Sequence, residues 1–188
     1  MQLPCSEELN IEYLGRLFDN TSECYKFFWF KAIVAKVTEG KQEISYEELV
    51  DEMIADAWYM VTEYHLNLGP KDTLEAVVNL IKQKYPELKS CKKKTAILDL
   101  LKNTQDRDIN SKKRTLTYNV PYRLQSPFMP SMKGKEWDVS ESNLIAKINQ
   151  EQRLMYYFTA LNGLSTSIIV NDDWANYIIK NQEIIRGW

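Results

Sequence analysis

Residues 25 to 30 read Tyr-Lys-Phe-Phe-Trp-Phe, so five of six consecutive positions are aromatic. On a helix, one apolar stripe combines part of this stretch with the residues that follow, namely Phe27, Phe30, Ile33, Val34 and Val37. Phe28 and Trp29 fall outside the stripe, so the helix is apolar nearly all round and is expected to lie buried between two layers. Lys26 falls within the stripe. We expect it to be a buried polar residue that either reaches solvent past the helix start or pairs with an acid of the next helix.

Start and stop signals predict further helices along the chain. Ser45 and Glu48 have the spacing of a capping box, and Asp72 with Glu75 repeats that spacing. The first long helix is expected to begin at Thr21 or Ser22 and to end before Gly40. The expected helical segments are 21–39, 45–66, 72–85, 91–103 and 143–150, followed by a last helix that Asp172 caps and that includes Ile184.

Other segments lack a helical signal. "TQDRDINSKKR" reads as a polar loop, "TLTYNVPY" alternates weakly as a strand does, and "RLMYYFTALNGLSTSIIV" predicts two strands around a tight turn at Asn162-Gly163. The expected fold class is therefore α+β and mainly α-helical, with five to six helices and a small antiparallel sheet or hairpin in the C-terminal half. We expect a single domain over residues 1–188, with a helical front half (1–105), a basic segment rich in loops and strands (106–135) and a helix-hairpin-helix end (136–188).

Bulk properties narrow the class of protein. The chain has 188 residues, of which 44% are hydrophobic and 27% charged, enough to bury a core without disulfides. No apolar run approaches the roughly 20 residues of a membrane span, and the start "MQLPCSEELN" lacks the features of a secretory signal. Three cysteines without C-x-x-C spacing fit neither a disulfide framework nor a zinc site. These features predict a cytoplasmic protein that does not associate with membranes.

Charge is strongly segregated along the chain although the net charge is only −2. Residues 1–88 carry 8 lysines and arginines against 16 acids, whereas residues 89–135 carry 12 against 3. A clustered positive field attracts polyanions, and contacts to nucleic-acid phosphates need many lysines and arginines on one face. The residues expected to contact nucleic acid are Lys92, Lys93, Lys94, Lys112, Lys113, Arg114 and Arg123. The competing interpretation is a solvated charged face without a partner.

Groups able to perform catalysis are few. The only histidine, His65, is expected near a helix end as a buried polar or exposed structural residue, because no second histidine is present to complete a catalytic or metal site. Asp72 with Glu87 and Lys89 has the residue types of a metal-dependent phosphodiesterase, but Asp72 is already expected as a helix cap. Asp172-Asp173 likewise has a sufficient role in capping. We therefore predict no catalytic residue and no metal ligand in this chain.

Several stretches together resemble a known family. They are "LFDNTSECYKFFWFKAIV", "YEELVDEMIADAWYMVTEYHLNLGPKDTL", "VPYRLQSPF", "LMYYF" and "DDWANYIIKNQEIIRGW". In this order they resemble the N-terminal region of bacterial HNH endonuclease domain-containing proteins, over most of the chain. An HNH site needs a histidine that activates water and further groups that hold the metal. His65 alone cannot supply these, so no catalytic residue carries over.

The resemblance implies a role in a larger nuclease. The chain would be an accessory, nucleic-acid-engaging domain that is not itself catalytic and precedes the HNH module, in keeping with its abrupt end at Trp188. DNA and that C-terminal module are the expected partners, a divalent metal is expected only in the module, and defence against foreign DNA is the expected setting. The alternative is a protein interaction or assembly module without nucleic-acid binding, in which acidic and basic faces pair within a homo-oligomer. A third interpretation is a self-contained hydrolase that uses Asp72 and Glu87.

Overall fold

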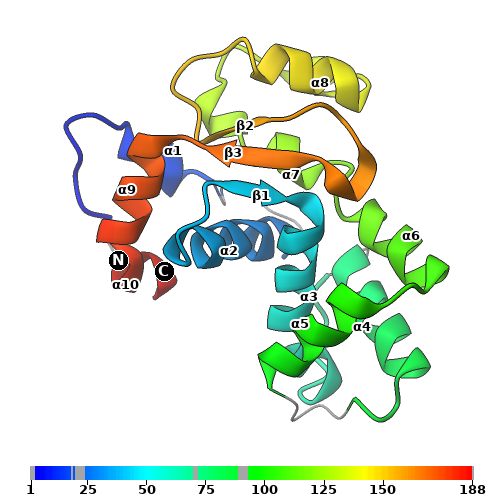
Figure 1. The fold of residues 1–188 in the computed structure, drawn as a ribbon. Helices are drawn as coiled ribbons and strands as arrows, with labels where there is room; N and C mark the ends of the chain where they lie inside the picture. Colours follow the sequence, from blue (N-terminus) through cyan, green and yellow to red (C-terminus); the bar gives the residue numbers. More distant parts are fainter. Residues whose placement is uncertain (1–2, 18, 20–23, 70–71, 89–92, 188) are drawn as a thin grey trace.

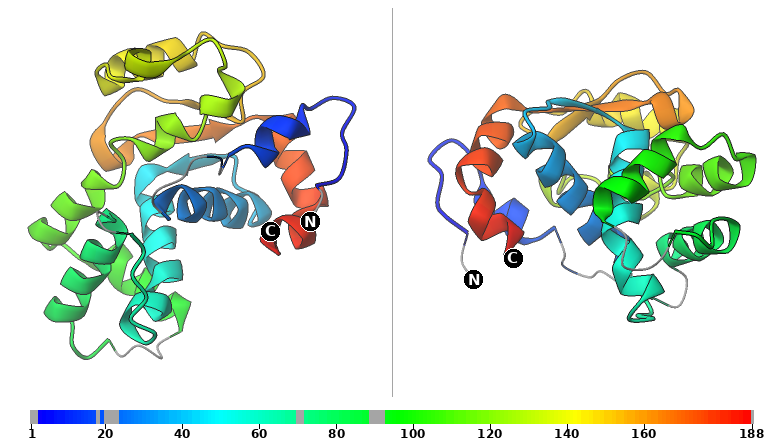
Figure 2. Two further views of the ribbon diagram at one scale, coloured as in Figure 1. Left: turned by 180° about the vertical axis from the view of Figure 1, so that it is seen from behind. Right: turned by 60° about the horizontal axis from the view of Figure 1, so that its bottom comes forward.

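The computed structural model describes residues 3–17, 19, 24–69, 72–88 and 93–187. A small sheet and helix α2 occupy the middle of the molecule, and a group of helices, α3 to α6, lies at one end (Figure 1). Helices α1, α9 and α10 lie at the opposite end, and α8 lies on the side of the sheet away from α2 (Figure 2). Helix α7 packs against both α2 and α8. The helical elements of the first part are α1 (Ile11–Gly15), α2 (Tyr25–Thr38), α3 (Tyr46–Thr62), α4 (Thr73–Lys84) and α5 (Lys94–Asn103).

The second part continues with short helices and the rest of the sheet. Its elements are α6 (Arg107–Thr115), α7 (Val120–Arg123), η1 (Ser126–Phe128), η2 (Gly134–Trp137), α8 (Glu141–Ile148), β2 (Tyr156–Phe158), η3 (Gly163–Ser165), β3 (Ser167–Val170), α9 (Asp172–Lys180) and α10 (Gln182–Arg186). The described residues thus confirm a mainly helical α+β fold with a small antiparallel sheet. They contain more helices than the five to six expected, because short helices occupy segments that carry no long apolar stripe.

The sheet joins distant parts of the chain. Its strand order is β1-β3-β2, and both pairs are antiparallel. Strand β1 (Glu43–Ser45), which the sequence did not predict, pairs with β3 so that Ile44 faces Ile168 across the ladder. Strands β2 and β3 confirm the expected pair, but η3 lies between them in place of a tight turn at Asn162-Gly163.

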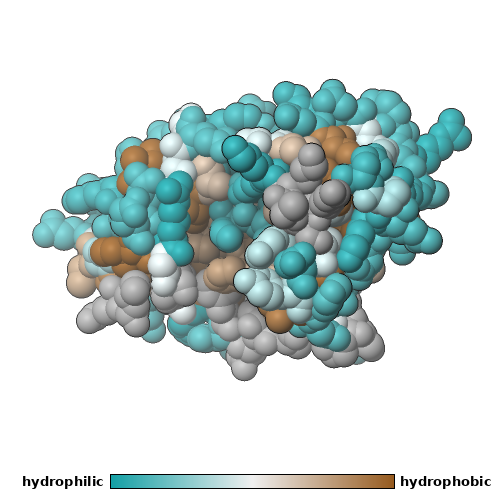
Figure 3. All heavy atoms as spheres, turned by 90° about the horizontal axis from the view of Figure 1, so that it is seen from below, coloured by the Kyte–Doolittle hydropathy of each residue, from teal (hydrophilic) through white to brown (hydrophobic). Residues whose placement is uncertain are grey.

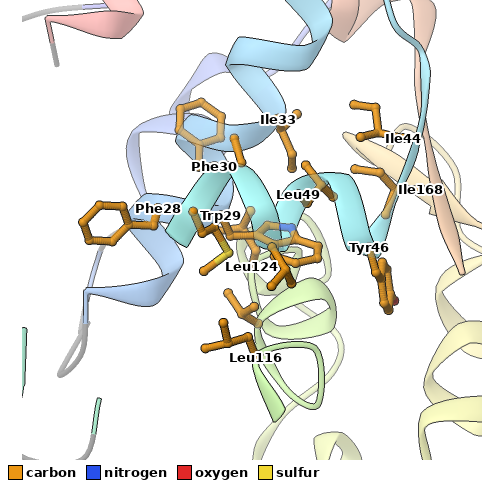
Figure 4. Packing of buried hydrophobic residues seen from close by; sticks show 14 of the residues in the cluster. Phe28, Trp29, Phe30, Ile33, Ile44, Tyr46, Leu49, Leu116, Leu124 and Ile168 are labelled. Atoms are coloured by element: carbon orange, nitrogen blue, oxygen red, sulfur yellow. The ribbon is translucent and has the colours of Figure 1, made fainter. Parts of the chain in front are cut away.

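Helix α2 is buried as expected, although on a different face. Phe28, Trp29 and Phe30 are each at most 3% exposed, whereas Phe27 is 44% exposed. Trp29 points among residues of α3 and α7, and its ring centroid lies 5.6 Å from that of Tyr46 (Figure 4). The predicted stripe was therefore wrong at Phe27, because α2 packs its Phe28 and Trp29 side into the core.

Local helix signals were confirmed at two starts. Ser45 and Glu48 form the reciprocal capping box that begins α3, and Asp72 accepts hydrogen bonds from Leu74 N and Glu75 N to begin α4. Glu75 does not complete a second capping box, because its carboxylate accepts a hydrogen bond from Leu68 N at 3.0 Å. The first described turn of α2 begins at Tyr25, and Thr21 and Ser22 lie outside the described residues.

The structure of segment 106–135 differs from the prediction. The expected loop "TQDRDINSKKR" contains helix α6, which Asp106 caps by accepting from Asp108 N and Ile109 N. The expected strand "TLTYNVPY" contains the start of α7, with Pro121 in its first turn. At the end of the chain, α8 and α9 confirm the expected helices, and Asn171 replaces Asp172 as the cap of α9. Within the described residues 136–187, α8 comes before β2 and β3, and α9 and α10 follow them.

Candidate nucleic-acid interface

Helix α3 carries acidic side chains that bind several of the lysines predicted to contact nucleic acid. Lys94, at the start of α5, forms ion pairs with Glu52 and, at 2.7 Å, with Asp56. Lys36 of α2 pairs with the other oxygen of Glu52 at 3.0 Å. Burial acts to raise the pKa of Glu52, but hydrogen bonds and charge attraction from Lys94 and Lys36 outweigh it and lower that pKa. Lys94 therefore joins α5 to α3.

The prediction that Lys113 contacts nucleic acid was wrong. Its side chain is fully buried, and its ammonium lies 2.6 Å from Asp51 Oδ1 and 3.3 Å from Glu47 Oε1, both on α3. Burial raises the pKa of Asp51 to about 6, although the Lys113 charge acts to lower it. A side chain without exposed surface cannot contact a phosphate, so Lys113 is part of the packing between α6 and α3.

The remaining predicted contacts stay at the surface. Lys93, Lys112 and Arg114 are exposed, and Arg123 forms a largely exposed ion pair with Asp138 at 2.7 Å. Exposed ion pairs of this kind contribute at most about 1 kcal/mol, so a phosphate can compete with Asp138 for Arg123. Lys92 lies outside the described residues.

Lys26 lies close to Arg123. Burial lowers the pKa of the half-buried Lys26, and the positive charge of Arg123 lowers it further. Within the described part of the chain, no carboxylate forms an ion pair with Lys26, and the acids of α3 are paired instead with lysines such as Lys31 and Lys36. The two cations thus belong to the start of α2 and the end of α7, which pack against each other.

Tyr122, the residue before Arg123, belongs to a buried tyrosine pair. Tyr46 Oη donates to Tyr122 Oη at 3.3 Å, and Tyr122 Oη contacts Glu141 Oε1 at 3.5 Å. Burial raises the pKa of Tyr122 to about 12, and burial also raises the pKa of Glu141 against the opposing charge of Arg114. These contacts fix α7 against α3 and α8, so the residue next to Tyr122, Arg123, has a rigid base.

The other titratable candidates have structural explanations. His65 is exposed, with a φ of 51°, directly after the end of α3, so it is not a buried polar residue. Asp72 is 7% exposed, and besides capping α4 its carboxylate accepts a hydrogen bond from the backbone of Cys24. Glu87 is exposed, and Lys89 lies outside the described residues. The structure therefore assigns Asp72 to helix capping, as the sequence indicated.

Metal-binding groups, membrane-spanning helices and similarity to known proteins give no further assignment. Among the described residues, no group of three or more histidine, cysteine, aspartate or glutamate side chains is placed to hold a metal ion. None of the helices in the described ranges combines the length and the apolar character that crossing a bilayer requires. The chain matches no family model, no curated protein and no solved structure.

Sequence reasoning missed the pairing that buries Lys113, although a signal was present. Ile109 and Lys113 are four residues apart, and both are buried on α6. Once Asp106 is recognised as a helix cap, this spacing places Lys113 on the apolar face and Lys112 and Arg114 away from it. The proximity of Lys26 to Arg123 had no such signal, because it depends on how α2 packs against α7.

Proposed function

We propose that this domain binds the phosphate backbone of nucleic acid at a surface centred on Lys26 and Arg123. Exposed cations of the segment 93–123 would extend that surface, namely Lys93, Lys112 and Arg114. The chemistry of strand cleavage would be supplied by another module. Lys94 and Lys113 are not part of this surface, because they pair with acids of α3.

The observation that carries the proposal is the placement of Lys26 and Arg123 at the start of α2 and the end of α7, two helices that pack against each other. Lys26 is half-buried and forms no ion pair with the described residues; burial lowers its pKa, and repulsion by the charge of Arg123 lowers it further. A bound phosphate would relieve this repulsion, because both side chains can donate charge-assisted hydrogen bonds to its oxygens. Binding sites often retain such locally unfavourable charge, since the ligand compensates for it.

The choice of nucleic acid as the polyanion has two supports. The segment 93–135 has more exposed cations than acids even after Lys94, Lys113 and Arg123 are paired. Two of its acids, Asp106 and Asp108, are moreover both held by Lys84. The resemblance to the N-terminal regions of bacterial HNH endonuclease domain-containing proteins favours DNA in particular. Both lines of support concern partners, and neither assigns a catalytic residue to this chain.

Binding to DNA can be tested with the double variant Lys26→Gln/Arg123→Gln. Affinity for a fluorescent DNA duplex is measured by anisotropy over a salt series. For the wild type we expect binding that weakens steeply with salt, since each phosphate contact adds roughly 0.9 to the slope of log K against log salt. The double variant should bind more weakly, and the slope of log K against log salt should be smaller by the contribution of about two phosphate contacts.

The matched control is Lys147→Gln/Lys180→Gln, which removes two exposed lysines from α8 and α9. This control should retain the affinity and salt slope of the wild type. Lys26→Gln should also leave stability unchanged or increase it, because the substitution removes the repulsion from Arg123. Lack of wild-type binding at low salt, or an equal loss in both double variants, would refute the proposal.

A further inference from the structure

A second candidate site, which neither Lys26 nor Arg123 lines, is a hollow between α2 and α10. The hollow has a volume of about 250 Å³. Its walls are mainly apolar and come from both helices, namely Phe27, Phe30, Val34, Ala35 and Ile185. Seen from below, apolar residues lie recessed beside hydrophilic ones (Figure 3). Phe27 is 44% exposed, whereas the next three residues of α2 are buried.

The charged groups at the rim of the hollow differ in how far they are exposed to solvent. Lys31 and Lys94 are 48% and 40% exposed in their side chains, whereas Asp56, between them, is only 9% exposed. Arg186 from α10 also lies at the rim. A ligand that enters the hollow therefore meets ammonium and guanidinium groups before it meets the carboxylate.

Two of these cations can bind an additional anion. Lys94 is anchored by Glu52 and by Asp56 Oδ1. Lys31 lies 3.4 Å from Asp56 Oδ2, an oxygen to which no described residue donates a hydrogen bond, so this contact is charge attraction alone. Arg186 uses Nη2 to donate to Thr38 Oγ1 at 2.8 Å and has other guanidinium donors available. Lys31 and Arg186 are thus the cations that can turn toward a ligand.

We propose that the hollow binds a small amphipathic carboxylate, with an aromatic ring or a branched aliphatic group against the phenylalanines and its carboxylate at Lys31 and Arg186. The size fits, because a cavity of about 150 Å³ already holds a benzene molecule. The lining also fits, since small-molecule sites combine apolar walls with a few polar groups that fix orientation. A cationic ligand is disfavoured by the three cations at the rim. A neutral apolar ligand would leave the rim unused.

The charge requirement can be tested with a pair of probes of nearly equal shape. The full chain is titrated with 1-naphthylacetate, with its neutral analogue 1-naphthylacetamide and with acetate, and amide chemical shifts are followed by NMR. We expect saturable shifts at Val34, Ala35 and Ile185 with naphthylacetate, weaker binding of the amide and no saturation with acetate. Equal affinity for the acid and the amide would overturn the carboxylate assignment, and no saturable shift with either would overturn the site.

Variants distinguish the hollow from general surface binding. Ala35→Leu should fill the hollow and reduce naphthylacetate affinity by at least about tenfold, while its unfolding transition reports whether the fold is retained. Lys31→Gln should weaken the acid by about fivefold and leave the amide unchanged. Lys147→Gln on α8 is the matched control and should leave the affinity for both probes unchanged. Because Lys26 and Arg123 do not line the hollow, failure here leaves the nucleic-acid proposal standing.

Discussion

Lys113 combines a full positive charge with a position that has no exposed surface. Its aliphatic stem lies on the buried side of α6 together with Ile109, and its ammonium reaches the acids of α3. Desolvating such a pair is unfavourable, and the attraction between the charges compensates only while both partners are present. Removing one partner should therefore destabilise the protein much more than removing an exposed lysine.

We predict that Lys113→Met destabilises the protein by about 3–5 kcal/mol, because it leaves Asp51 buried without its counter-ion. Urea denaturation measures the loss. Lys112→Met is the matched control, since Lys112 is exposed in the same turn and its substitution should change stability by less than about 0.5 kcal/mol. Similar unfolding midpoints for the two variants would contradict the buried ion pair.

The same variant should show a characteristic pH dependence. Burial already raises the pKa of Asp51 to about 6 in the wild type, and loss of Lys113 should raise that pKa further. An acid with a raised pKa in the folded state contributes stability below its unfolded pKa of about 3.9, and that contribution is lost as pH rises through the folded pKa. The destabilisation of Lys113→Met should therefore be larger at pH 8 than at pH 5. A larger destabilisation at pH 5 than at pH 8 would show that Asp51 does not control the pH dependence of this variant.

At the scale of elements, the sequence predicted helices best where a start signal and an apolar stripe coincide. Helix α3 has both, because Ser45 and Glu48 cap it and its buried residues recur along one long segment. Helix α6 has the cap Asp106 but buries only Ile109 and Lys113, so its polar sequence resembles a loop. Strand β1 has three residues and pairs with a strand more than 120 residues later, and local periodicity carries no information on such a partner.

The capping box also yields a prediction. Ser45→Ala removes the hydroxyl that accepts from Glu48 N at 3.2 Å and should destabilise the protein by about 1 kcal/mol in urea denaturation. Ser142→Ala serves as the comparison, because Ser142 is exposed within α8, where alanine favours the helix. If Ser45→Ala were as stable as Ser142→Ala, the capping box would contribute nothing to the start of α3.

At the scale of the whole molecule, segregated charge along the sequence does not translate directly into segregated charge on the surface. The acids of α3 belong to the acidic first part of the chain, and they bind Lys94 and Lys113 from the basic middle. Part of the asymmetry is therefore neutralised inside the fold. Composition could predict that oppositely charged segments exist, but only the packing of α5 and α6 on α3 determines which lysines remain exposed.

The ends of the described chain are joined by a contact that spans nearly its full length. Tyr177 on α9 donates a hydrogen bond from Oη to the carbonyl oxygen of Pro4 at 2.6 Å. Its ring is buried next to Trp174, with centroids 6.1 Å apart, so the hydroxyl is held in place by packing. This contact attaches the N-terminal segment, including α1, to the C-terminal helices.

We predict that Tyr177→Phe loosens the N-terminal segment and leaves the rest of the fold intact. Phenylalanine keeps the ring contact with Trp174, so only the hydrogen bond is lost, a change of about 1 kcal/mol. Hydrogen exchange should become faster at the amides of α1, where Leu14 is buried, and stay unchanged in α3. Tyr64→Phe is the control, because Tyr64 is 63% exposed and its ring contact with Tyr59 is retained. Unchanged exchange in α1 of Tyr177→Phe would mean that apolar packing alone, through residues such as Leu14 and Leu17, holds the N-terminal segment against the core.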